Sequence, residues 1–332
     1  MEVQSILNTS LCKKLNIKYP IIQAGMGFLA RAELAAAVSN AGGLGIVGAG
    51  ALSAEEFHGE VKKVKNMTDK PFGVDILFAT MPKTEETKVA QYTQLVQEHI
   101  DAAFQENVPI IAAGLGNPAQ IVPEAHAKGI KVMALVGNVK NALRVAASRV
   151  DIVVAQGHEA GGHTGRIGSL ALIPLIVDAV KVPVVAAGGI ADGRGLVAAL
   201  ALGACGVWMG TRFVATKEAF CHINYKNRIA EIDEEGTVIT RCYTGKPCRV
   251  IKNSFTEEWK NRESEILPYP LQQMKIGMDV WASGRREGKI DVGSCAAGQI
   301  SGMIRDVVSA AEVISQLMSE AEQVLEKGLS SR

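Results

Sequence analysis

Residues 156–165 hold four glycines, two histidines and one glutamate, and they follow the largely apolar run at residues 151–155. Glycine lets a backbone adopt positive φ or approach a flat ligand closely. A neutral histidine can accept a proton near physiological pH. At the end of a buried strand, this composition is typical of a catalytic loop in an α/β enzyme. Taken alone, it fits equally well a glycine-rich turn whose histidines serve only the loop.

The spacing of His158, Glu159 and His163 does not match the zinc motif that it first suggests. The helical zinc motif, H-E-x-x-H, places two histidines one helical turn apart. Here the second histidine lies one residue further along, and two glycines interrupt any helix. We therefore expect no metal at this loop. Nothing nearby has the pattern of an activated serine, and no cysteine has a paired histidine by sequence.

Two further glycine-rich corners indicate where a phosphate would bind. Residues 187–193 begin with Ala187, Gly188 and Gly189, and they end the apolar run at 182–187. Gly210 and Thr211 end the next run, at 206–209. In a (β/α)8 barrel, the loops after strands seven and eight bind phosphate through backbone N–H groups. The pair of corners predicts a phosphate-bearing ligand, with the Thr211 hydroxyl as an extra donor. The alternative is two ordinary tight turns.

A third corner, at residues 24–27, follows the first apolar run and contains Gly25 and Met26. Its backbone could lie along a flat heterocycle, with the Met26 thioether as a soft lid. Alone this signal is weak, since a methionine after a strand usually belongs to barrel packing.

A strand followed by a helix, repeated along the chain, must position these glycine corners. Continuously apolar strands are buried on both faces, as in a parallel sheet. Eight such units before residue 215 predict a (β/α)8 TIM barrel, with a doubly wound sheet as the alternative. Residues 43–48 spell G-x-G-x-x-G, but they enter a strand, so they lack the context of a dinucleotide site. The predicted strands are residues 20–24, 45–48, 72–77, 109–113, 131–136, 151–155, 182–187 and 206–209.

After residue 215 the alternation of strands and helices stops. Residues 222–268 are polar and look irregular, whereas residues 269–328 look helical. We expect three parts in the chain: a ligand-binding barrel at 1–221, a smaller, mostly helical cap over its mouth at 222–300, and a C-terminal helix at 301–332 that packs back on the barrel.

Composition limits the remaining functions. The chain has 332 residues, 48% of them hydrophobic, and a net charge of +1. That charge offers no electrostatic basis for binding nucleic acid or an anionic membrane. The six cysteines are scattered without a C-x-x-C pair, which predicts reduced thiols in a cytoplasm. Residues 1–19 lack the pattern of a signal peptide. We expect the partner to be a small-molecule substrate. The sequence does not decide whether the chain forms a homodimer.

With these motifs assembled, the chain resembles the nitronate monooxygenases, formerly called 2-nitropropane dioxygenases, which share their fold and FMN site with the type II FMN-dependent enoyl-ACP reductases. The most specific matches lie at residues 159–163, 187–193 and 209–213. The likeness runs nearly end to end, from residues 19–26 to residues 293–299. Three ordered motifs at the family's spacing make chance agreement improbable.

The resemblance implies FMN in the mouth of the barrel and an oxidation that uses O₂. His163 falls on the family's catalytic histidine, which removes the proton next to a nitro group or orients a nitronate. The redox chemistry belongs to the cofactor. The positions that the resemblance assigns to FMN comprise a phosphate group (Gly188, Gly189, Gly210, Thr211), the ring contacts (Gly25, Met26, Gly161, Gly162) and a polar contact, Gln156. The adjoining Ala187 and Asp75 complete the expected FMN site.

Asp75 is also a departure from the family, which usually has Gly-Val-Asn where this chain has Gly73, Val74 and Asp75. An asparagine can donate a hydrogen bond to a flavin carbonyl, but an ionised aspartate cannot. Asp75 is therefore turned away, protonated or a sign of altered chemistry. Some relatives also carry a lysine on strand five, where residues 133–135 are apolar here.

Two other functions compete with nitronate oxidation. The first is an NAD(P)H-dependent reductase of an activated alkene, such as an enoyl thioester, or of a quinone; residues 222–226 and 249–253 look more like the enoyl reductases. The connection at residues 78–108 looks more like the nitronate enzymes. The second is a barrel that only binds a phosphate-bearing ligand, in which His163 would have no purpose.

Overall fold

The computed structural model describes residues 3–50, 52–78, 92–269 and 271–328. Eight parallel strands follow one another in the order β1-β9-β8-β6-β5-β4-β3-β2, and a parallel bridge between Ile22 and Leu44 joins β1 to the β2 side. The chain is thus a (β/α)8 TIM barrel, and the doubly wound alternative is wrong. The barrel strands are β1 Ile21–Gln23, β2 Gly45–Gly48, β3 Phe72–Leu77, β4 Ile110–Leu115, β5 Lys131–Val136, β6 Ile152–Gln156, β8 Val184–Ala187 and β9 Val207–Met209.

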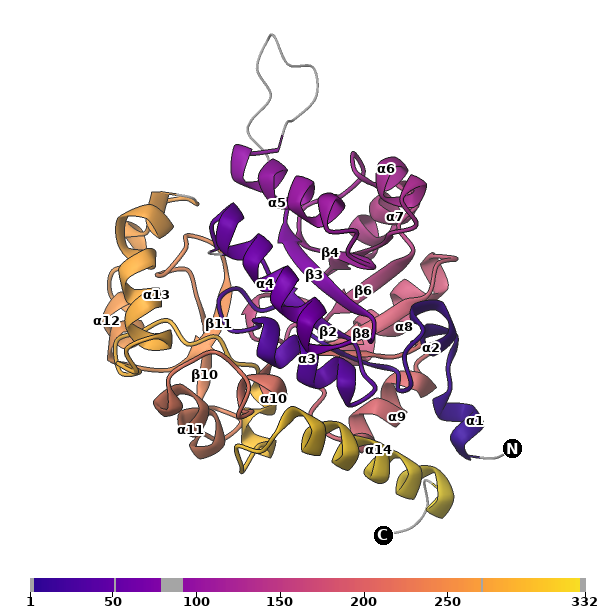
Figure 1. The fold of residues 1–332 in the computed structure, drawn as a ribbon. Helices are drawn as coiled ribbons and strands as arrows, with labels where there is room; N and C mark the ends of the chain where they lie inside the picture. The colour runs from indigo at the N-terminus through magenta and orange to yellow at the C-terminus, as the bar shows by residue number, and fades with distance from the viewer. Residues whose placement is uncertain (1–2, 51, 79–91, 270, 329–332) are drawn as a thin grey trace.

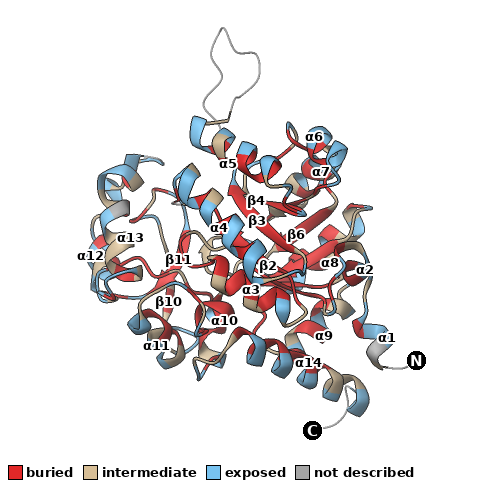
Figure 2. Cartoon of the chain, viewed as in Figure 1, coloured by how far each residue is buried: buried red, intermediate tan, exposed pale blue. Residues whose placement is uncertain are grey.

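The strands are buried on both faces, as their continuous apolar sequence predicts. Side chains that point into the barrel form one core cluster, which includes Ile22 and its register partner Trp208. The alternate side chains, such as Ile21 and Val207, join a larger cluster between the strands and the helices. Figure 2 shows this division, with buried strands at the centre and exposed residues on the outer faces of the helices.

Helices follow the strands and surround the barrel (Figure 1). The C-terminal helix α14 packs against α9 and α3, so it occupies the place of the eighth helix in the ring. Ser53 caps α4 in a capping box with Glu56, and Ser309 caps α14 in the same way. The ring helices are α3 Ala32–Asn40, α4 Ala54–Met67, α5 Gln94–Gln105, α6 Val122–Ala127, α7 Val139–Ala147, α8 Ser169–Ala179, α9 Gly193–Ala201 and α14 Ala310–Lys327. Two short helices, α1 Val3–Leu7 and α2 Ser10–Leu15, precede the barrel, and α10 Thr211–Val214 follows β9.

The prediction of an irregular segment at residues 222–268 is wrong. It contains two helices and a hairpin, because short β-branched runs at residues 237–240 and 248–251 pair with each other. Residues 269–328 are likewise not helical throughout, since residues 286–298 contain no helix. In Figure 1 this part gathers on one side of the barrel. Its elements are α11 Ile223–Glu231, β10 Thr237–Thr240, β11 Cys248–Ile251, α12 Ser254–Lys260, α13 Met278–Arg285, a π-helical turn at Gln273–Gly277 and 3₁₀ turns at Glu263–Glu265 and Gln299–Met303.

The predicted catalytic loop also contains a strand that its sequence did not indicate. Strand β7, Gly162–His163, adds to the hairpin, with His163 opposite Cys248 and Gly162 opposite Arg249. The boundaries at residues 221 and 300 stay predictions, and residues 79–91 of the connection at 78–108 lie outside the described residues. In the described part of the chain, no helix combines the length and apolar character that crossing a bilayer requires.

Candidate functional site

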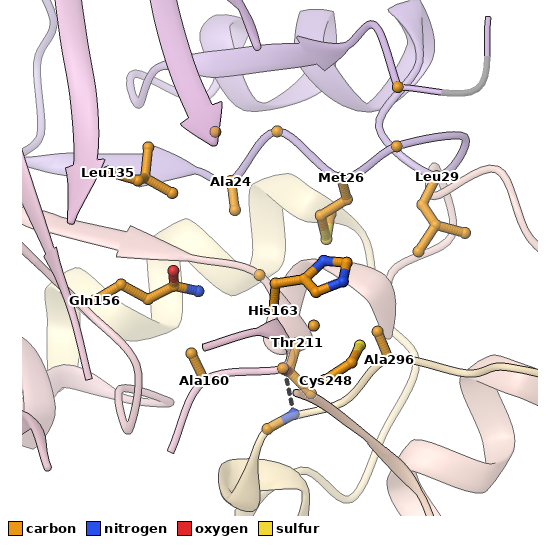
Figure 3. Close-up of a pocket in the computed structure, with 18 of the residues that line it drawn as sticks. Ala24, Met26, Leu29, Leu135, Gln156, Ala160, His163, Thr211, Cys248 and Ala296 are labelled. Carbon is orange, nitrogen blue, oxygen red and sulfur yellow. Dashed lines mark hydrogen bonds between the residues drawn. The ribbon is translucent and has the colours of Figure 1, made fainter. Parts of the chain in front are cut away.

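A cavity of about 320 Å³ opens at the carboxyl ends of the barrel strands. Its size lies in the range of pockets that hold a small organic ligand. Figure 3 shows His163 projecting into it near Met26, with Gln156 and Thr211 on other walls. All twelve residues that the sequence suggested as site residues line this one cavity: Gly25, Met26, Asp75, Gln156, Gly161, Gly162, His163, Ala187, Gly188, Gly189, Gly210 and Thr211.

His163 is held at the cavity wall by the short strand β7. Its Nε2 lies 3.1 Å from Oγ1 of Thr244, in the turn between β10 and β11. The pKa of His163 is lowered from about 6.5 to about 4, mainly by burial and in addition by the positive charges of Lys246 and Arg285. The imidazole is therefore neutral at physiological pH, the state that a proton acceptor needs.

Thr244 can select the tautomer of that imidazole. Its hydroxyl lies 3.2 Å from the carbonyl oxygen of Lys246, to which it can donate its single proton. The hydroxyl oxygen then accepts a hydrogen bond from Nε2–H of His163. In this arrangement Nδ1 is the unprotonated nitrogen, so it is the atom that could take a proton from a substrate.

The corner formed by Gly188 and Gly189 requires glycine. Their φ angles are 88° and 74°, a region that side chains with a Cβ rarely adopt. Beside it, the buried Thr211 Oγ1 accepts a hydrogen bond of 2.9 Å from the backbone N–H of Gly298 (Figure 3). Because Oγ1 acts there as an acceptor, its own proton is available to a ligand oxygen.

Asp75 lies within β3 and packs against Gly25, where any larger side chain would overlap the carboxyl group. Only 5% of Asp75 is exposed, and its Oδ1 has no hydrogen-bond partner among the described residues. Burial raises the pKa of Asp75 well above its usual value, and the backbone hydrogen bond from Gly114 opposes the shift without cancelling it. Burial thus favours the protonated carboxyl of Asp75, which can donate a hydrogen bond.

The other titratable residues of the loop serve its shape. The carboxylate of Glu159 accepts hydrogen bonds from the backbone N–H and the hydroxyl of Ser169, at the start of α8. Nδ1 of His158 lies 3.1 Å from the carbonyl oxygen of Gly165. The two contacts give both side chains structural partners. Glu159 borders the cavity, but its carboxylate is engaged by Ser169, and His158 does not line the cavity.

The far wall of the cavity comes from residues that sequence reasoning missed. Arg285 donates from Nε to the carbonyl oxygen of Ser294 at 3.0 Å, and its guanidinium lies 4.5 Å above the ring of Trp281. No carboxylate pairs with it within the described ranges. Tyr243 and Cys248 line the same wall. None of these residues belongs to a glycine-rich motif; the sequence predicted a cap over the mouth at residues 222–300 but singled out none of its side chains for the site.

Known proteins resemble this chain over most of its length. The model of the nitronate monooxygenase family matches residues 8–320. A probable nitronate monooxygenase of Staphylococcus saprophyticus is 38% identical over 300 residues, which cover 80% of this chain and 84% of the relative. FabK from Thermotoga maritima has a TM-score of 0.87 at 34% identity, and the match covers 96% of this chain and 97% of FabK.

Nitroalkane oxidase from Streptomyces ansochromogenes has a TM-score of 0.85 at 28% identity, and the match covers 96% of this chain and 99% of that enzyme. Relatives and structures thus agree over almost the whole chain. The chain belongs to the nitronate monooxygenase family and is an oxidoreductase.

Proposed function

We propose that this protein is an FMN-dependent nitronate monooxygenase that oxidises alkyl nitronates and nitroalkanes with O₂. The observation that carries the proposal is the neutral His163 on the wall of a cavity that also contains the two glycine corners. A proton acceptor and a binding site for a phosphorylated heterocycle thus line the same cavity.

The residues present fit FMN. The left-handed backbone at Gly188 and Gly189, with Gly210 and Thr211 beside it, would hold the phosphate on N–H and O–H donors. Burial raises the pKa of Asp75 and so favours its protonated form, and its Oδ1 has no partner among the described residues; in that form the carboxyl would donate to a polar edge of the ring.

The ring itself would lie along the main chain at Gly25, Met26, Gly161 and Gly162. Gln156 would be a further polar contact, and Ala187 would border the phosphate. When bound, FMN would supply the electron acceptor for the substrate and the reaction with O₂.

His163 would remove the carbon-bound proton next to the nitro group of a neutral nitroalkane, at its Nδ1. A nitronate has already lost that proton, so for it the same imidazole would only orient the anion. Lys246 and Arg285 both lower the pKa of His163, which means that the potential at the imidazole is positive. A positive potential favours an anionic substrate over a neutral one.

A second candidate is an NAD(P)H-dependent reductase of an activated alkene or a quinone. The support for it is the likeness to FabK, at 34% identity over nearly the whole of both chains. In that case NAD(P)H would be the reductant, and the cavity would admit an enoyl thioester beside the cofactor.

Two assays on the purified protein separate the candidates. The released cofactor is first identified by its visible spectrum and chromatography, with FMN expected. Rapid O₂ uptake on propionate 3-nitronate, without bleaching of the flavin by NADH in the absence of air, would support the monooxygenase. Fast anaerobic bleaching by NADH would support the reductase instead. A colourless protein that binds no added flavin would refute both.

A further inference from the structure

We propose that a second cavity beside His163 binds the phosphate groups of an extended, phosphate-bearing ligand, such as a nucleotide-linked thioester or a nicotinamide dinucleotide phosphate. This goes beyond the proposed oxidation of nitronates, which needs no such ligand, and it would give the second candidate, the reductase, a separate site for the phosphate groups of its ligand.

The second cavity has a volume of about 590 Å³ and adjoins the first. It lies where the loops after β4, β5 and β6 meet the turn between β10 and β11. Both cavities are lined by the same five residues, namely Gly114, Leu115, Leu135, Gln156 and His163. A ligand held in the second cavity could therefore extend its other end past His163 into the first.

Three cationic side chains line this cavity: Arg144, Arg166 and Lys246. Among the described residues, none of the three has a carboxylate within ion-pair distance, and no Asp or Glu is part of the lining. Three uncompensated positive charges around one hollow create a field that attracts a polyanion.

The types of side chain favour phosphate among anions. A guanidinium presents a planar fork of donors that matches phosphate oxygens, and the cavity offers two of them. The N-terminus of α7, a helix of nine residues, borders the same hollow through its cap Asn138. A helix N-terminus adds a partial positive charge, which supports the two arginines.

The test is isothermal titration calorimetry of the FMN-loaded protein. Bound FMN fills the phosphate site of the first cavity, so the probes can bind only elsewhere. The probes are inorganic pyrophosphate, coenzyme A and NADP⁺. We expect at least one of them to bind, and we expect the double variant Arg144→Gln/Arg166→Gln to raise its dissociation constant on the order of tenfold or more. Binding should also weaken in high salt, because the cations are exposed.

The matched controls are Lys62→Gln and Lys181→Gln, which remove exposed cations that line neither cavity and have no carboxylate partner among the described residues. They should leave the dissociation constant within about twofold. Binding of coenzyme A alone would identify a thioester ligand, and binding of NADP⁺ alone would identify a nicotinamide cosubstrate. Binding of pyrophosphate alone, or of both nucleotides, would support the shared phosphate chemistry.

The proposal fails if no probe binds at about 10 mM, or if the double variant binds every probe as tightly as the parent protein. The visible spectrum of FMN in each variant shows whether it is folded and loaded. Failure here would leave the proposed oxidation of nitronates standing, because that reaction uses only the first cavity.

Discussion

The two walls of the cavity are built in different ways. The barrel wall consists of corners at strand ends, where Gly188, Gly189 and Gly210 offer mainly backbone groups. The opposite wall comes from residues beyond the barrel, where Thr244, Trp281 and others offer side chains. The first wall is suited to hold a cofactor, and the second to position the proton acceptor. Holding a phosphate needs local backbone geometry, whereas placing His163 needs contacts between distant segments.

The largest expected effect comes from breaking the barrel wall. Gly189→Val should abolish retention of FMN, because a β-branched residue at φ 74° must distort the corner that would hold the phosphate. The measurement is the ratio of FMN to protein after purification. The control is Gly129→Val, at φ 73° in an exposed turn outside both cavities, which imposes similar strain. Full FMN content in the Gly189 variant would contradict the predicted site.

The next effect concerns the proton acceptor. His163→Ala should keep the yellow colour but slow turnover of a neutral nitroalkane on the order of 10² or more, since a base contributes about that factor. Turnover of the matching nitronate should fall far less, because that substrate carries no proton to remove. His126→Ala, which removes an imidazole outside the cavities, is the control. Equal losses on both substrates would remove the role of His163 as the base.

A smaller effect should follow at the side-chain wall. Thr244→Val keeps the shape of the side chain but removes the hydroxyl that lies 3.1 Å from Nε2 of His163. We expect kcat on a neutral nitroalkane to fall about tenfold, which corresponds to one hydrogen bond. Thr240→Val is the matched control, because its hydroxyl accepts from the backbone N–H of Cys242 and does not line the cavity. An unshifted pH profile and kcat in the Thr244 variant would show that the hydroxyl does not position the imidazole.

The smallest effect concerns the stability of the flavin-free protein. The pKa of Asp75 is raised in the folded state, so the folded protein keeps a proton that the unfolded chain releases above about pH 4. The stability that Asp75 contributes is therefore lost as the pH rises from that value through its raised pKa. The free energy of unfolding of Asp75→Asn minus that of the parent should be larger at about pH 8 than at about pH 5, by about 1 kcal/mol or more. Urea unfolding at both pH values measures it, and a constant difference would mean that Asp75 is ionised.

The sequence predicted the barrel well because its signals are local. Apolar runs ending in glycine corners specify strands and turns within a few residues, as at Gly188 and Gly189. The other wall depends on pairing over long separations. His163 and Thr244 lie 81 residues apart, and the two-residue strand β7, which pairs with β11, has no apolar pattern of its own. No periodicity along the chain could therefore reveal Thr244 or Arg285 as neighbours of His163.

A crystal structure of the protein with FMN bound tests the central claim most directly. The account predicts the phosphate at Gly188, Gly189, Gly210 and Thr211, and the flavin ring along Gly25 and Met26, with the imidazole of His163 facing it. A phosphate bound on any other face of the barrel, or an imidazole turned away from the ring, would contradict it.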